Sequence, residues 1–369
     1  MANRPKKADI QGAKKKGMSF SRIMINTVLG VVVLVFVVAI SFLLLQISGK
    51  NSLYSRADDG EILTTLSNLA VELGGSIDGE GDWQEGDFRY EGIHYRYNSD
   101  MLTFLFLGID KMGVVERVEE GLNGGQSDAI FLLALNPHNK RISVIGIPRD
   151  TMTKVQVYLE DGSYWGPIQA QLAIQHGYGD GVELSCERTV EAVTELMYGL
   201  PIHGYFAINM GAIPLLNDAV GGIEVEALET MDFTGFHVEQ GEILHLEGMN
   251  AYHYLHDRST EVHYTAGGRL QRQKQYLLAY ASAVMDELKK NVGFAASLYG
   301  TLSKYMVTDI SVNEVSFLAM QALEYSFDGD DMHVLEGETA IGEVYEEFYP
   351  DEEALYRLII DIFYEEVVD

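Results

Sequence analysis

Charged side chains that flank apolar segments are the residues of this chain best suited to chemistry. Three apolar segments predict buried strands, each beside a charged residue: Leu102–Ile109 precedes Asp110, Asp128 precedes Ala129–Leu135, and Ile142–Ile147 precedes Pro148, Arg149 and Asp150. Carboxylates and an arginine at the ends of neighbouring buried strands predict a polyanion site that a divalent metal completes.

More cationic and amide donors follow far downstream. They are Arg258, Arg269, Arg272 and Gln273, in a chain whose formal net charge is −29. Arginines gathered in so acidic a chain favour an anion-binding site over simple solvation of the surface. Structural interpretations stay open at this point: Asp110 could cap a turn, Arg149 and Asp150 could form an ion pair, and the downstream arginines could lie on a solvated helix face.

The charge is distributed unevenly, and its distribution predicts a membrane anchor. Residues 1–22 carry seven Lys and Arg side chains against Asp9 alone, so the rest of the chain has a net charge of −35. Residues 23–49 contain no charged side chain, and a helix of that length, at about 1.5 Å per residue, exceeds the roughly 30 Å core of a bilayer. A cleaved signal peptide is the competing interpretation, but the apolar run is longer than a usual signal core.

Four segments are therefore expected: a basic cytoplasmic segment (1–22), a single transmembrane anchor (23–47), a juxtamembrane spacer (48–99) and an extracytoplasmic domain (100–369). The positive-inside rule places the last of these outside the cell. Cys186 is the one cysteine of the chain, so no intrachain disulfide forms and the domain depends on its hydrophobic core. The acidic exterior argues against nucleic acid as a partner.

Strand and helix patterns alternate along the main body. Helices are expected at 183–198, 247–255 and 269–290, a further strand at 205–208, and a last helix that starts after Pro350 and ends near Tyr364. Residues 58–73 have the spacing of a short amphipathic helix. Strands interleaved with helices predict an α/β fold whose core sheet is covered on both faces.

Six short motifs resemble the LytR-CpsA-Psr family in their order and rough spacing. They are Gly108-Ile109-Asp110, Gln126-Ser127-Asp128, Ile147-Pro148-Arg149-Asp150, Asp218-Ala219-Val220-Gly221-Gly222-Ile223-Glu224-Val225, Leu246-Glu247-Gly248 and Gly268-Arg269-Leu270-Gln271-Arg272-Gln273. Each motif alone is weak, whereas six in order are specific. The basic end and the single anchor match the layout of that family as well.

The resemblance implies a phosphotransferase of the bacterial envelope. Such an enzyme moves a glycopolymer, of the wall teichoic acid or capsular polysaccharide type, from a polyprenyl pyrophosphate carrier to peptidoglycan. The implied fold is an α/β/α domain with a mainly β core, an apolar tunnel for the lipid and a polar mouth for the pyrophosphate. Attack on a pyrophosphate requires that the developing negative charge be neutralised, which a hard cation and several arginines do.

The resemblance also implies roles for single residues. Asp110 and Asp128 would hold Mg²⁺ or Mn²⁺, which prefer oxygen ligands. The pyrophosphate would be bound by Arg149, Arg258, Arg269, Arg272, Gln273 and His256. Gln273 shares a helix face with Arg269, whereas Arg272 lies off that face and either orients the site or pairs with Asp150. Arg149 and Asp150 are the expected catalytic residues, with Asp150 or water taking the proton of the acceptor hydroxyl.

Two positions depart from the family pattern. His256-Asp257-Arg258 stands where Arg-x-Arg is usual, and Pro167-Ile168-Gln169 stands where Lys-Ile-Asn is common. Each lost charged hydrogen bond costs about 1.5–3 kcal/mol, and a protonated His256 beside the pyrophosphate would recover part of it. His253, His256 and His263 also permit a zinc interpretation, which no further ligand pattern supports.

Three functions therefore remain open on the sequence. The first is the transferase, with activity reduced by the departures at Pro167 and His256. The second is a non-catalytic or regulatory binder of polyprenyl pyrophosphate lipids, which the same departures favour. The third is a polyprenyl pyrophosphate phosphatase that uses water in place of a sugar hydroxyl.

Overall fold

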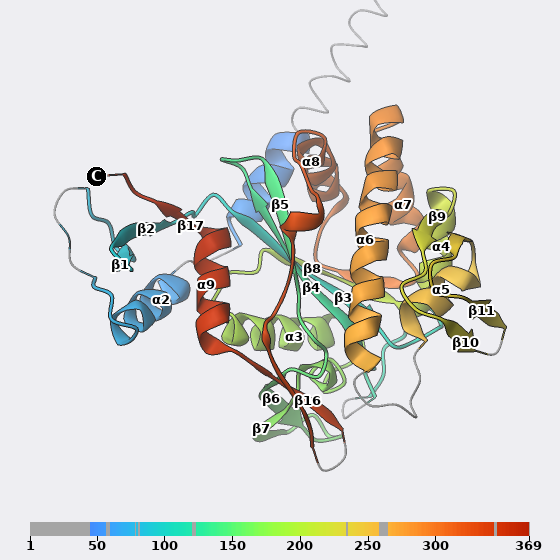
Figure 1. Cartoon of the computed structure of the whole chain (residues 1–369), viewed down its shortest axis with the longest axis horizontal. Helices are drawn as coiled ribbons and strands as arrows, with labels where there is room; N and C mark the ends of the chain where they lie inside the picture. Colours follow the sequence, from blue (N-terminus) through green and yellow to red (C-terminus); the bar gives the residue numbers. More distant parts are fainter. Residues whose placement is uncertain are drawn as a thin grey trace, which may run out of the picture.

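A mixed sheet of six strands forms the centre of the computed structural model, which describes residues 45–56, 60–77, 79, 82–119, 123–233, 235–257, 265–342 and 345–368 (Figure 1). The strand order is β13-β8-β3-β4-β5-β14. The bounds are β3 Leu102–Ile109, β4 Ser127–Asn136, β5 Arg141–Gly146, β8 Gly204–Asn209, β13 Met306–Thr308 and β14 Met332–Val334. The β3–β8 and β5–β14 pairs are parallel, and the other three pairs are antiparallel.

Both faces of this sheet are covered, because its central strands are apolar along almost their whole length. Leu105, Leu107, Leu132 and Ile145 point to one face and share a core with α3 (Glu183–Leu196) and α9 (Glu352–Phe363). Phe131 and Val144 point to the other face, where Leu270 and Leu277 of the long helix α6 (Thr265–Lys290) pack on them. The expected α/β fold with a covered central sheet is confirmed.

The segment expected to be a spacer, residues 48–99, is part of the same folded core. Residues 45–54 are helical, and α2 (Gly60–Glu72) buries Ile62 and Leu66 in the cluster that contains Tyr356 of α9. Strands β1 (Phe88–Tyr90) and β2 (Ile93–Tyr97) form a sheet with β17 (Tyr364–Glu366) at the other end of the chain. The folded domain therefore begins well before residue 100.

The remaining elements are hairpins and short helices around the central sheet. The paired strands are β6 Met152–Tyr158 with β7 Tyr164–Gln171, β9 Ile223–Glu226 with β12 Ile243–Leu246, β10 Met231–Phe233 with β11 Phe236–Val238, and β15 Gly337–Ile341 with β16 Glu346–Pro350. The helices are α4 Ile213–Ala219, α5 Met249–His256, α7 Phe294–Leu302 and α8 Val312–Ala322, with 3-10 turns η1 Leu172–Ile174, η2 Met210–Ala212 and η3 Gly329–Asp331.

The expected membrane anchor, residues 23–47, lies almost wholly outside the described residues, as does the basic segment 1–22. Among the residues that are described, none of the helices combines the length and apolar character that crossing a bilayer requires.

Candidate functional site

A β-bulge aims Asp128 at the site. Strands β3 and β4 pair Gly108 with Ala129 and then Ile109 with Ser127, so Asp128 is an extra residue on β4. A bulge of this kind redirects a side chain that regular pairing would place elsewhere. The Asp128 side chain is only 4% exposed and points toward two arginines.

Those arginines, Arg149 and Arg269, come from segments 120 positions apart and meet on one carboxylate. Arg149 follows the end of β5 and donates from Nη1 to Oδ1 of Asp128, and Arg269 on the first turns of α6 approaches Oδ2 at 3.5 Å. Their side chains are 16% and 6% exposed. Two guanidinium groups thus share one carboxylate, so these three side chains together carry one net positive charge and present donors to an anion.

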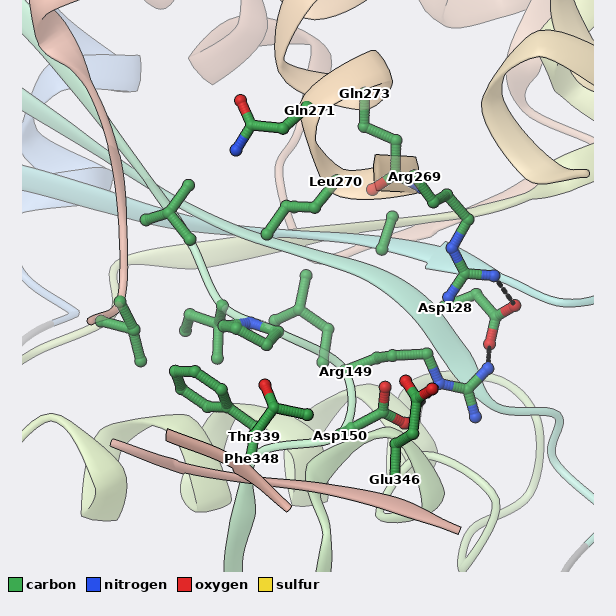
Figure 2. A pocket seen from close by; sticks show the side chains of 16 residues that line it. Asp128, Arg149, Asp150, Arg269, Leu270, Gln271, Gln273, Thr339, Glu346 and Phe348 are labelled. Atoms are coloured by element: carbon green, nitrogen blue, oxygen red, sulfur yellow. Dashed lines mark hydrogen bonds and ion pairs between the residues drawn. The ribbon is translucent and has the colours of Figure 1, made fainter. Parts of the chain in front are cut away.

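The cluster lines a cavity of about 240 Å³ (Figure 2). Its walls come from β4, the Pro148–Asp150 segment, the start of α6 and the β15–β16 hairpin. In Figure 2 the α6 residues lie above the cavity and the hairpin lies below it. The cavity is lined by charged side chains, among them Arg149, Asp150 and Glu346, and by apolar ones such as Ile147 and Leu335.

Three neighbouring residues contact Asp150, two at its carboxylate and one at its backbone carbonyl. It is buried, its Oδ1 accepts the amide of Gln171 at 2.9 Å, and Arg149 Nε lies 3.5 Å away. Its backbone carbonyl accepts the N–H of Phe348 on β16 at 2.9 Å. The predicted Arg149–Asp150 pair therefore exists, and it is embedded in a cavity wall.

The other predicted carboxylate, Asp110, lies at the edge of the site. Its side chain is 56% exposed, and Oδ1 is 3.9 Å from Nε2 of His256. His256 is stacked on Tyr252, with ring centroids 4.8 Å apart. Burial raises the pKa of the Tyr252 hydroxyl, and the charges of Asp257, Asp110 and Asp128 raise it further, so both predicted metal ligands lie near this ring.

The donor set fits a cation only in part. Within the described residues, no group of three or more His, Cys, Asp and Glu side chains could hold a metal ion. Mg²⁺ is commonly bound by one or two carboxylates together with substrate phosphates, and a carboxylate retains free lone pairs after accepting two hydrogen bonds. Asp110 and Asp128 therefore suit a cation that a pyrophosphate also ligates, and do not suit one held by the protein alone.

One predicted pyrophosphate ligand, Arg272, lies away from the cavity. Arg272 is 2% exposed and donates to the Glu229 carboxylate and the Asp257 carbonyl, away from the cavity. Of the two alternatives expected for Arg272, pairing with Asp150 is wrong, because its position on α6 places it against the small core of β9–β12 and α5. Burial lowers the pKa of its guanidinium. Arg258 lies outside the described residues.

The side-chain amides of Gln273 and Gln171 both lie at the site. Gln273 lines the cavity as expected, and its Nε2 donates to the Leu255 carbonyl at 3.3 Å. The departure at Pro167 is remote, because Pro167 pairs with Gln156 in the β6–β7 hairpin and is exposed. The amide that reaches Asp150 belongs to Gln171, at the end of the same strand.

Two further cavities lie beneath α6, the first of them adjoining the charged cavity. Ala129 and Gln273 also line a second cavity of about 170 Å³, whose walls are almost wholly apolar. Phe106, Phe131 and Leu277 separate it from a third cavity of about 510 Å³ between the sheet, α6 and α8. We call the second and third cavities the apolar channel. The family resemblance predicts an apolar tunnel for a lipid; the walls of these cavities are sheet and helix side chains, with Phe106, Phe131 and Leu277 between them.

Three residues of the site were not identified from the sequence. Gln126 accepts a hydrogen bond from Arg149 Nη2, Gln171 binds Asp150, and Glu346 lines the cavity from the C-terminal hairpin. Gln126 stands beside Asp128 in one of the quoted motifs, so its proximity to the site was available. Glu346 gives no such signal, because only the pairing of distant segments brings it to Asp150.

Comparison with known proteins identifies the family of this chain. Residues 80–355 match the LytR_cpsA_psr family. The chain is similar to proteins named polyisoprenyl-teichoic acid–peptidoglycan teichoic acid transferase TagU, with 26% identity in Oceanobacillus iheyensis (62% of this chain, 66% of the relative) and 27% in Halalkalibacterium halodurans (69% and 76%). The alignment thus spans just under two thirds of the first of these relatives.

Solved structures show the same fold. The crystal structure of B. subtilis TagV aligns with a TM-score of 0.53 and 22% identity over 70% of this chain and 94% of TagV. A structure titled TagT bound to LI-WTA aligns with a TM-score of 0.50 and 18% identity over 71% of this chain and 89% of TagT. With a family match that covers most of its length, the chain belongs to the LytR_cpsA_psr family.

Proposed function

We propose that this protein transfers a phospho-linked glycopolymer, of the teichoic acid or capsular type, from a polyprenyl pyrophosphate carrier to peptidoglycan. The observation that carries the proposal is the position of the Arg149–Asp128–Arg269 cluster in a cavity that shares Ala129 and Gln273 with the apolar channel. A diphosphate attached to a long hydrocarbon chain is the ligand class that matches two adjacent arginines beside apolar cavities. The names of the TagU relatives support the same reaction.

Individual residues have separate roles in the proposed reaction. Arg149 and Arg269 bind pyrophosphate oxygens and stabilise the charge that develops on them during attack. Asp128 holds the two guanidinium groups together at the cavity before the substrate arrives, and Gln171 fixes Asp150 beside them. The apolar channel removes the carrier chain from water, which favours binding by about 0.8 kcal/mol for each CH₂ group that is buried.

We further propose that Mg²⁺ or Mn²⁺ accompanies the pyrophosphate, with Asp110 and Asp128 as its protein ligands. When bound, such a cation neutralises phosphate charge and orients the leaving group. The proposed location is the cell membrane, with residues 23–47 as a single anchor and the folded domain outside the cell, where peptidoglycan is available.

Transfer by the full-length protein tests the proposal. The assay supplies an undecaprenyl pyrophosphate-linked glycan, a peptidoglycan acceptor and Mg²⁺, and it measures the glycan attached to the acceptor. Transfer that disappears in Arg149→Ala supports the enzyme. Release of lipid monophosphate without acceptor identifies a phosphatase instead.

A non-catalytic binder is the second candidate. It is favoured by His256, which stands where the family usually has arginine and which contacts the exposed Asp110 at 3.9 Å. Tight binding of the lipid pyrophosphate without turnover, in wild type and with the cation present, would establish this function in place of the transferase.

A further inference from the structure

The β15–β16 hairpin forms the cavity wall opposite α6 (Figure 2). It is fastened to the Asp150 segment by backbone contacts: Phe348 N–H donates to the Asp150 carbonyl at 2.9 Å, and Thr151 bridges to Phe348 in parallel register. The Gln171 amide donates both to the Asp150 carboxylate at 2.9 Å and to the Glu346 carbonyl at 2.7 Å. Glu346 and Asp150 are therefore neighbours through one shared amide.

Strand alternation decides which hairpin side chains face the cavity. Residues directly opposite each other in an antiparallel pair share a face, and Thr339 pairs with Phe348 while Ile341 pairs with Glu346. Thr339, Phe348 and Glu346 all line the cavity. Glu347 has the opposite orientation, and its carboxylate accepts the Tyr349 hydroxyl at 2.6 Å on the other face.

The cavity thus holds three carboxylates with different surroundings. Each Asp128 oxygen meets an arginine. Asp150 is buried under the Gln171 amide and Arg149 Nε. Glu346 is only half-buried. The charged side chains that line the cavity with it include Arg149 and Asp150 on the neighbouring segment, Asp128 on β4 and Arg269 on α6.

We propose that Glu346 takes the proton from the acceptor hydroxyl. In this step the acceptor oxygen forms a bond to the phosphorus that carries the glycan, and its O–H bond breaks with the proton passing to the Glu346 carboxylate. The bond from that phosphorus to the bridging oxygen breaks, and polyprenyl monophosphate leaves. Asp128 and Asp150 then act as positioning residues. This inference rests on the proposed function and replaces Asp150 by Glu346 as the base.

The test compares Glu346→Gln with Glu347→Gln in the full-length protein. The two substitutions make the same chemical change on adjacent residues that face opposite sides of one strand. General bases contribute about 10²–10⁴-fold, so Glu346→Gln should lower the turnover number of transfer by at least about 100-fold while binding of undecaprenyl pyrophosphate is unchanged. Glu347→Gln should transfer at the wild-type rate. Thermal unfolding of each variant reports whether the fold is retained, and Glu346→Asp provides a second, milder variant.

The pH profile separates Glu346 from Asp150. If Glu346 is the base, the fall of the transfer rate at acidic pH disappears in Glu346→Gln and persists in Asp150→Asn. Near-normal transfer by Glu346→Gln, or loss of the acidic limb in Asp150→Asn alone, overturns the inference. The proposed function and the role of Glu346 fail in different ways. A wild-type protein that binds the lipid but never transfers the glycan overturns the proposed function, whereas an active wild type together with an active Glu346→Gln overturns only the role of Glu346.

Discussion

Replacement of Asp128 by asparagine removes the one charge that holds Arg149 and Arg269 together. The change is nearly isosteric, yet it leaves two guanidinium groups side by side without their shared counter-charge. Loss of one partner from a buried ion pair costs about 3–5 kcal/mol, and the 16% exposure of Arg149 favours the lower end of that range. We therefore expect a loss of about 3 kcal/mol in the free energy of unfolding, or a melting temperature lowered by roughly 4–6 °C in a domain of this size.

Inorganic pyrophosphate should reverse much of this loss. The anion replaces the missing carboxylate between the arginines, and a ligand at 100 times its Kd stabilises the folded state by about 2.7 kcal/mol. The assay is thermal unfolding of the full-length protein with and without pyrophosphate. Asp331→Asn is the matched control, because Asp331 is a buried carboxylate paired with Arg141 away from the cavity. Equal rescue of both variants, or no rescue of Asp128→Asn, would refute the assignment of the cluster as an anion site.

Three other perturbations have defined outcomes. Phe131→Trp enlarges a side chain that lies between the two cavities of the apolar channel. Calorimetry should then show weaker binding of undecaprenyl pyrophosphate and unchanged binding of inorganic pyrophosphate. An equal loss of affinity for both ligands would contradict the assignment of the apolar channel to the lipid. Arg272→Ala should lower the free energy of unfolding in urea by about 3 kcal/mol and leave the affinity for pyrophosphate nearly unchanged. A large loss of pyrophosphate affinity would show that Arg272 is a ligand after all. Burial lowers the pKa of His176 and His203 to about 4, so the unfolded state binds more protons than the folded state between pH 6.5 and 4. The free energy of unfolding should therefore decrease as the pH is lowered through that window, by up to about 1.4 kcal/mol per pH unit for each histidine. A free energy of unfolding that does not change between pH 6.5 and 4 contradicts this.

Hydrophobic pattern alone predicts the elements that carry the site. The strand expected at 102–109 is β3, the helix expected at 183–198 is α3, and the helix expected at 269–290 is the main part of α6. These segments are long and apolar on the face that they bury, so local pattern and tertiary packing agree. The last helix begins after Pro350 as expected, because Asp351 caps it by accepting the N–H groups of Glu353 and Ala354.

Local pattern does not predict which segments meet. Asp128 points into the site because β4 has an extra residue at that position, and a bulge depends on the register of two strands. Glu346 reaches Asp150 through a hairpin almost 200 residues further along the chain. Arg272 and Arg269 stand one turn apart, and their opposite destinations follow from the rotation of α6 against the sheet. Each of these facts belongs to tertiary structure.

A crystal structure of the protein with undecaprenyl pyrophosphate bound tests the central claim most directly. The account predicts both phosphates between the guanidinium groups of Arg149 and Arg269, with the hydrocarbon chain running beneath α6 past Phe106 and Phe131. Diphosphate density away from these two arginines, or a chain that lies outside the space under the helix, would contradict it.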